Sequence, residues 1–212
     1  MDHLQRSSVG APWDDAFGGG IVDGAVTLIT GAPGVGKTGM LLQIAAGLAT
    51  DRRRNVLYVL RGQTPISLRE KMDRCGIPQG RISIATGLDG GLIARIGTFA
   101  AVIVDPVEEN LDEVKNVCKS TGTPLFIVKN LAEGASLHSG DIHTVDVFAE
   151  ILFADVEDPG GRRLLRIMKN RYGRVLDTPL AMTDGVLKAA PPKRWHMQLA
   201  GWLKWAFHGR WR

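Results

Sequence analysis

The sequence predicts an α/β fold, in which a mostly parallel, twisted sheet is flanked by helices and carries antiparallel hairpins at its C-terminal edge. Short apolar runs with the length of buried strands alternate with segments whose apolar residues recur at helical spacing. This alternation is typical of a parallel sheet that is covered on both faces. Beyond residue 145, paired runs are separated by Pro and Gly turns, which indicates hairpins.

Each element can be placed from its apolar pattern and its flanking turn residues. The expected strands are residues 25–30, 55–60, 81–85, 100–105, 124–128, 145–153 and 162–168. The expected helices are residues 37–50, 65–75 and 108–120. Residues 158–161 and 183–185 supply two hairpin turns. Residues 1–24 are Gly-rich and polar, so we expect regular structure to start after them.

Length and composition fit one globular domain with a tail. The 212 residues are 44% hydrophobic and 23% charged, within the range of globular proteins. We expect an N-terminal segment (1–24), a core (25–190) and a tail (191–212). No apolar run approaches the ~18 residues of a membrane span, and the N-terminus does not resemble a secretory signal. Two cysteines make neither a disulfide framework nor a zinc site, so we expect a cytoplasmic protein.

The net charge of +4 is concentrated in the tail. Residues 193–212 contain five of the 26 Lys and Arg residues and no Asp or Glu. Aromatic and leucine side chains recur there every four residues, so a helix would be amphipathic and basic. Three interpretations stay open: a helix docked on the core, a helix on an anionic membrane surface, or a site for nucleic acid or a partner protein.

The segment GAPGVGKT lies between an expected strand and an expected helix. A phosphate-binding loop needs glycines where the backbone wraps a phosphate, a lysine that reaches the outer phosphates and a hydroxyl for magnesium. Lys37 and Thr38 supply the last two. The pattern predicts that ATP, with Mg²⁺, is bound by Gly31, Ala32, Pro33, Gly34, Val35, Gly36, Lys37, Thr38 and Gly39.

Asp105 ends the apolar run 100–104. A P-loop enzyme needs a carboxylate at a strand end to hold the water shell of its magnesium ion. We therefore expect Asp105 to act with Thr38 as the metal site, Asp105 through water. The alternative is an ordinary strand-terminal Asp in a turn with Pro106.

Further segments resemble a known family. They are the Gly-rich run 18–24 that leads into the P-loop, Leu57-Tyr58-Val59, Gly134-Ala135, Met182-Thr183, and Lys169-Asn170-Arg171-Tyr172-Gly173. Together they resemble the core of RadA and the related RecA-like, DnaB-like and RepA-like ATPases, and the last is similar to the KNRFG motif of RadA. The resemblance covers residues 10–190. It implies a RecA-like P-loop NTPase fold, a homo-oligomeric ring or filament, and single-stranded DNA as a partner.

The resemblance also implies a role for two cations. In that family the Lys and Arg of the KNRFG motif reach the nucleotide of a neighbouring subunit or a nearby interface, and the matching residues here are Lys169 and Arg171. Cations supplied by a neighbour stabilise charge on the transferring phosphoryl group and couple hydrolysis to assembly. The alternative is a basic strand end in solvent.

The sequence departs from the family at the usual catalytic carboxylate. RecA-like ATPases place a Glu after the strand that follows the P-loop helix, and an ungapped alignment puts Gln63 there. Gln63 can hold a water but cannot accept its proton, so hydrolysis would be slow or would depend on Glu70 or Asp105. The zinc module and Lon-like domain of RadA have no counterpart in these 212 residues.

Three functional hypotheses follow. The leading one is a DNA-associated oligomeric ATPase in recombination, repair or replication, with weak candidate DNA contacts at Lys129, Ser136 and Ser139. The first alternative is a nucleotide-binding regulatory switch with little or no hydrolysis, which Gln63 favours. The second is a KaiC-like regulatory ATPase without DNA affinity. His138 and His143 have no supporting ligand pattern, so no metal site is expected there.

Overall fold

The computed structural model describes residues 4–107, 111–131, 142–153, 161–183 and 186–190. The tail and the candidate DNA contacts Ser136 and Ser139 lie outside the described residues, as does His138. Within the described ranges, no helix has both the length and the hydropathy that a bilayer span needs.

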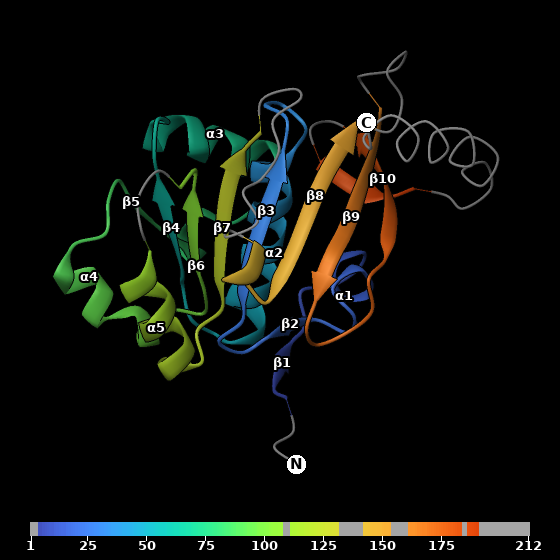
Figure 1. Ribbon diagram of the computed structural model, residues 1–212. Coiled ribbons are helices and arrows are strands. Elements are labelled where there is room, and N and C mark those ends of the chain that lie inside the picture. The colour runs from blue at the N-terminus through green and yellow to red at the C-terminus, as the bar shows by residue number, and fades with distance from the viewer. Residues whose placement is uncertain (1–3, 108–110, 132–141, 154–160, 184–185, 191–212) are drawn as a thin grey trace.

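A nine-stranded sheet organises the molecule, in the order β11-β10-β9-β8-β3-β7-β6-β4-β5 (Figure 1). Its strands are β3 (Val26–Gly31), β4 (Val56–Leu60), β5 (Ile82–Ala85), β6 (Val102–Asp105), β7 (Leu125–Asn130), β8 (Val147–Phe153), β9 (Arg162–Asn170), β10 (Asp177–Thr183) and β11 (Val186–Ala189). The six strands from β8 to β5 pair in parallel. The pairs β8–β9, β9–β10 and β10–β11 are antiparallel. The predicted sheet and hairpins are therefore confirmed.

Helices cover both faces of the parallel part. They are α2 (Lys37–Asp51), α3 (Pro65–Arg74), α4 (Gly90–Ala94) and α5 (Asp112–Thr121), with 3₁₀ turns at Gln79–Arg81 and Ile96–Thr98. Alternate residues of β4 show the two faces: Tyr58 packs in the core under α2 and α3, whereas Leu57 and Val59 pack in the core under α5. The predicted two-sided burial is confirmed; α4 and the 3₁₀ turns were not predicted.

Regular structure begins well before residue 25, so that expectation was wrong. The N-terminal segment forms β1 (Arg6–Ser7), α1 (Trp13–Ala16) and β2 (Ile21–Val22). Trp13 is only 2% exposed and Phe17 4%, and both belong to the core under α2. The Gly-rich composition hid two large apolar side chains that hold this segment on the core.

The strand directions give the sheet two different edges. Parallel strands β3, β4 and β6 end at one edge, which we call the P-loop edge, because the P-loop follows β3. β9 runs the opposite way: Arg163 pairs with Phe153, and Lys169 pairs with Phe148. Six residues of strand span about 20 Å. β9 therefore reaches from the P-loop edge to the other end of the sheet, which we call the far edge.

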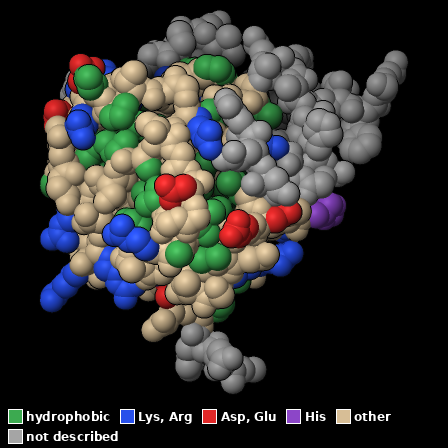
Figure 2. All heavy atoms as spheres, turned by 90° about the vertical axis from the view of Figure 1, so that its left-hand side faces the viewer, with side chains coloured by type: hydrophobic (Ala, Val, Ile, Leu, Met, Phe, Trp, Pro, Cys, Tyr) green, Lys and Arg blue, Asp and Glu red, His purple; other side chains and the backbone are tan. Residues whose placement is uncertain are grey.

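The face seen in Figure 2, on the β5 side, carries basic and acidic side chains interspersed. It has no uniformly positive field of the kind expected of an extended nucleic-acid-binding surface.

Candidate nucleotide-binding site

The P-loop contains glycines at positions where another residue would strain the backbone. Gly31 has φ +146°, and a Cβ there would lie 2.4 Å from the carbonyl oxygen of Ile151. Gly36, at φ +111°, is the N-cap of α2, and a Cβ would approach Met182 Cε to 2.9 Å. A side chain at Gly31 would clash with the backbone of β8, and a side chain at either position would strain the backbone because φ is positive. The loop conformation is therefore fixed by β3, β8 and the C-terminal hairpin.

Lys37 folds back across this loop. Its Nζ donates to the carbonyl oxygens of Gly31 at 2.7 Å and Ala32 at 2.9 Å, and the residue is 6% exposed. Burial lowers the pKa of Lys37, and the negative charge of Asp105 opposes that shift. The ammonium is thus held beside the loop that phosphates would enter.

Asp105 joins two strands to the start of α2. Thr38 Oγ1 donates to Asp105 Oδ2 at 2.9 Å, and Tyr58 Oη donates to the same oxygen at 2.6 Å. Burial raises the pKa of Tyr58 well above its usual value, and the charge and hydrogen bond of Asp105 raise it further. Tyr58 is therefore a neutral donor that fixes the carboxylate. Its role was missed because an aromatic residue in a buried strand looks like ordinary core.

Thr38 and Asp105 together suit a hard cation. A hydroxyl and a carboxylate oxygen are ligands that Mg²⁺ accepts. Among the described residues, no group of three or more His, Cys, Asp and Glu could hold a metal ion. An ion at Thr38 would therefore complete its shell with water and phosphate oxygens, as Mg²⁺ does at nucleotide sites.

A cavity of about 400 Å³ opens beside the P-loop. Its lining comes from several elements and comprises Pro33, Gly34, Gly36, Lys37, Thr38, Gly39, Gln63, Lys71, Arg74, Cys75, Asp105, Asn130 and Met182. The structure thus brings Gln63 and Asp105 to the P-loop, as expected from the sequence. Lys71, Arg74 and Asn130 were not predicted. Asn130 could have been found, because it ends the strand next to β3.

The Gln63 side chain is hydrogen-bonded to a lysine. Its Oε1 accepts a hydrogen bond of 2.9 Å from Lys71 Nζ. Of the two carboxylates suggested as alternative bases, Asp105 lines the cavity, whereas Glu70 is exposed on α3 and is not in the lining. Asp105 already accepts two hydrogen bonds. No general base is therefore evident in the described part of the cavity.

Arg163, at the start of β9, supports the P-loop from the hairpin side. It is 3% exposed, its Nε donates to the carbonyl oxygen of Val35 at 3.1 Å, and its guanidinium lies 4.3 Å from the centre of the Phe153 ring. Such a stacked, buried guanidinium holds the backbone it contacts. Sequence reasoning missed it, because the contact joins positions 128 residues apart.

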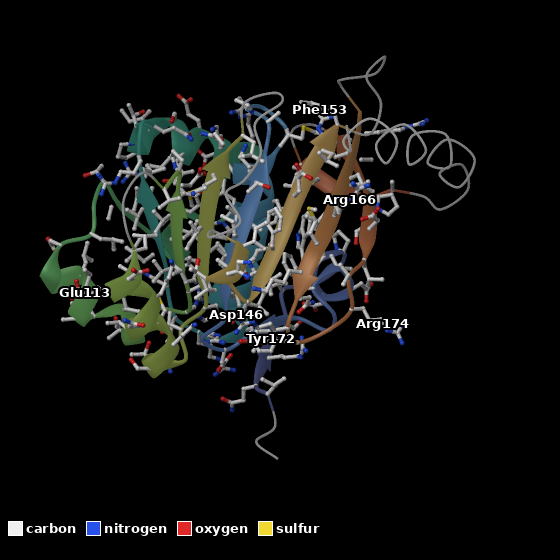
Figure 3. The ribbon with its side chains drawn as sticks, in the orientation of Figure 1. Glu113, Asp146, Phe153, Arg166, Tyr172 and Arg174 are labelled. Atoms are coloured by element: carbon white, nitrogen blue, oxygen red, sulfur yellow. The ribbon has the colours of Figure 1, made fainter. Side chains whose placement is uncertain are left out.

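Lys169 and Arg171 lie at the far edge, away from the P-loop of the same chain. Lys169 Nζ donates to the carbonyl oxygens of Ile142 at 2.8 Å and Val145 at 2.6 Å. Arg171 Nη1 lies 3.3 Å from Asp146 Oδ1, and the Arg171 side chain is 55% exposed. Figure 3 shows Asp146 and Tyr172 together at the end of the sheet opposite to Phe153. With about 20 Å of β9 between the edges, neither cation can reach the nucleotide of its own chain.

Comparison with known proteins agrees with this geometry. The model of the family described as "ATPase: KaiC" matches residues 10–121, more than half of the 212-residue chain. The chain belongs to the KaiC family of ATPases. Membership in this family implies nucleotide binding, and the match includes the P-loop and Asp105.

Curated relatives include the DNA repair protein RadA of Pseudomonas aeruginosa, which is 29% identical over 213 aligned positions. The match covers 89% of this chain and 46% of that protein, so the chain spans less than half the length of this relative. The predicted resemblance to RadA is confirmed at this level.

Solved structures show the same fold. A KaiC-like protein from Pyrococcus horikoshii OT3 superposes with a TM-score of 0.68 at 17% identity, over 89% of this chain and all of that one. The RadB recombinase superposes with a TM-score of 0.67 at 17% identity, over 87% of this chain and 99% of that one. The predicted RecA-like fold is therefore confirmed.

Proposed function

We propose that the chain binds ATP with Mg²⁺ at the P-loop cavity and hydrolyses it as a subunit of a homo-oligomer that acts on single-stranded DNA. The observation that carries this proposal is the convergence of Lys37, Thr38 and Asp105 at one cavity, with hydrogen bonds that fix each side chain. In P-loop enzymes, a Lys, a Thr and an Asp at these positions bind the phosphates and the metal ion during phosphoryl transfer.

The binding step uses the backbone and Lys37. Backbone N–H groups at the start of α2 and in the loop cradle phosphate oxygens, aided by the helix N-terminus. Lys37 exchanges its contacts with the Gly31 and Ala32 carbonyls for phosphate oxygens, because a charged acceptor makes the stronger hydrogen bond. Thr38 Oγ1 would hold a Mg²⁺ ion and Asp105 would hold its water shell, and the ion would supply positive charge that neutralises the outer phosphates.

The assembly step uses the far edge. Lys169 and Arg171 cannot serve their own nucleotide, so a role in phosphoryl transfer requires a second copy of the chain. Arg171 is exposed enough to meet one. The name of the Pseudomonas relative supports action on DNA, since that protein is called a DNA repair protein. Residues 193–212 stay a proposed contact for a protein partner or an anionic surface.

Two measurements on the full chain test this proposal. Titration with ATP and Mg²⁺ should show binding, and phosphate release should rise when single-stranded DNA is added. If the chain binds ATP but phosphate release does not change when single-stranded DNA is added, the proposed action on DNA is contradicted. A chain that binds no nucleotide would contradict the whole proposal.

A regulatory switch with little turnover is the second candidate. It is favoured by the cavity lining, in which Asp105 is the only carboxylate among the described residues and is already bonded to Thr38 and Tyr58. Gln63 cannot accept a proton. The same assays separate the two functions, because a switch would bind ATP tightly and release no phosphate with or without DNA.

A further inference from the structure

Helix α3 forms one wall of the cavity beside the P-loop. It starts at Pro65, after Thr64, whose hydroxyl accepts from the N–H of Ser67 at 3.2 Å. Lys71, Arg74 and Cys75 are three and four residues apart, so they share one face of the helix. All three line the cavity. The side chains of α3 therefore meet any ligand that the P-loop holds.

This wall is positively charged. The described lining contains the cations Lys37, Lys71 and Arg74 but only one carboxylate, Asp105. Lys37 alone is the cation that the P-loop motif supplies. The other two are additional, and cations gathered around one cavity favour a ligand with several negative charges.

The contact between Lys71 and Gln63 fixes the direction of the amide. Because Gln63 Oε1 accepts from Lys71 Nζ, any ligand oxygen that meets Gln63 meets the NH₂ group. An NH₂ donor suits a phosphate oxygen. Both side chains at this point, one amide and one ammonium, are therefore donors toward an anion.

The strand order places this pair near the outer phosphates. Gln63 follows β4, and Leu60 at the end of β4 pairs with Asp105 at the end of β6. Asp105 and Thr38, which are hydrogen-bonded to each other, would hold the metal ion, and in P-loop enzymes that ion neutralises the outer phosphates. Gln63 and Lys71 line the same cavity as Thr38 and Asp105. Gln63 follows β4, the strand after which RecA-like ATPases carry their catalytic Glu.

We propose that Lys71 and Gln63 form a contact site for the terminal phosphate of the bound nucleotide, so that α3 distinguishes a nucleoside triphosphate from a diphosphate in cis. Arg74 adds to the positive potential of the same wall. This inference rests on the proposed binding of ATP at the P-loop. It gives Gln63 the role of a phosphate donor rather than that of a water-activating group.

The test compares Lys71→Met with Arg69→Met. Arg69 is exposed on the same helix and lines a different hollow, with Met72 and Gln79. Calorimetric titrations with ATP and with ADP, each with Mg²⁺, give the affinity ratio of the two nucleotides for each full-length variant. Lys71→Met should weaken ATP binding by about tenfold or more, the size of one charge-assisted hydrogen bond, and ADP binding by less than about twofold. Lys71→Arg should restore most of the ratio, and Arg69→Met should leave it unchanged.

Other outcomes overturn the inference in distinguishable ways. Equal losses of ATP and ADP affinity in Lys71→Met would show that Lys71 has a structural role. Unchanged affinities for both nucleotides would show that Lys71 does not contact the terminal phosphate. Neither result would contradict ATP binding at the P-loop. A wild-type chain that binds neither nucleotide would overturn the proposed function and the inference together. Thermal melting checks the fold of each variant, and Lys71→Gln replaces Lys71→Met if that variant melts early.

Discussion

The two edges of the sheet differ in what one chain can complete. At the P-loop edge, Lys37, Thr38 and Asp105 are fixed by hydrogen bonds to one another and to the loop, and they surround one cavity. At the far edge, Lys169 is tied to backbone carbonyls and Arg171 stays half-exposed beside a buried Asp146. The first edge gathers its side chains around a cavity within one chain. In the proposed function, the second edge takes part in phosphoryl transfer only when another copy of the chain is present.

β9 and the hairpins physically connect the two edges. Arg163 contacts the P-loop at one end of β9, and Lys169 lies near its other end. A strand can transmit a structural change from one edge to the other only if its contacts at both edges are rigid. The comparison therefore predicts that changes at the P-loop edge affect binding by one chain, whereas changes at the far edge affect turnover only in assemblies.

The largest effect should come from Lys37→Ala. Removing the ammonium takes away the main charge that meets the phosphates, so ATP affinity should fall by about 100-fold or more. The melting temperature should drop only slightly, because the lost contacts are hydrogen bonds to two carbonyls rather than core packing. Lys119→Ala on α5 is the matched control. Unchanged ATP affinity in a folded Lys37→Ala protein would show that ATP does not bind at the P-loop.

Arg163→Met should have the next largest effect. It leaves the Val35 carbonyl without its buried donor, which costs about 1–3 kcal/mol of unfolding free energy. ATP affinity should also fall, because the loop loses a fixed support. Denaturant unfolding with and without nucleotide measures both. Arg166→Met on the same strand is the control, because the Arg166 side chain is 21% exposed and pairs with Asp177 rather than with the P-loop. Equal behaviour of the two variants would show that Arg163 does not support the loop.

The smallest effect should come from Gln63→Glu. A carboxylate could accept the proton of the attacking water, so phosphate release at saturating ATP should rise by several-fold. Lys71 would pair with the new carboxylate and hold its pKa low, which weakens it as a base. The double variant Gln63→Glu/Lys71→Met should therefore be faster than the single one at saturating ATP. Gln79→Glu is a control outside the cavity. Unchanged turnover in both variants, with ATP bound, would show that position 63 does not limit hydrolysis.

The sequence predicted the elements whose signals are local. GAPGVGKT, the apolar run before Asp105 and the alternating strands each occupy a few consecutive residues, and the structure places them as expected. Gln63, which the alignment puts at the usual catalytic position, lines the cavity, and its partner Lys71 was not predicted there. A helix face that points at a cavity can be recognised only when the position of the cavity is known.

Contacts between distant segments could not be predicted in this way. Arg163 reaches Val35 only because β9 pairs antiparallel with β8. The register of that pairing cannot be predicted from either segment alone. Trp13 and Phe17 were overlooked because Gly and polar neighbours dominate the composition of residues 1–24. Both side chains pack in the hydrophobic core that α2 and the sheet form together.

The most direct test of the account mixes two inactive proteins. Subunits with Lys37→Ala should bind ATP about 100-fold more weakly but keep an intact far edge, whereas subunits with Arg171→Ala should bind ATP but lack the far-edge guanidinium. If the far edge completes the site of a neighbour, an equimolar mixture should recover about a quarter of wild-type phosphate release, the fraction of random contacts that pair two intact edges. Activity no greater than the mean of the separate proteins, or full activity of an Arg171→Ala monomer, would contradict the account.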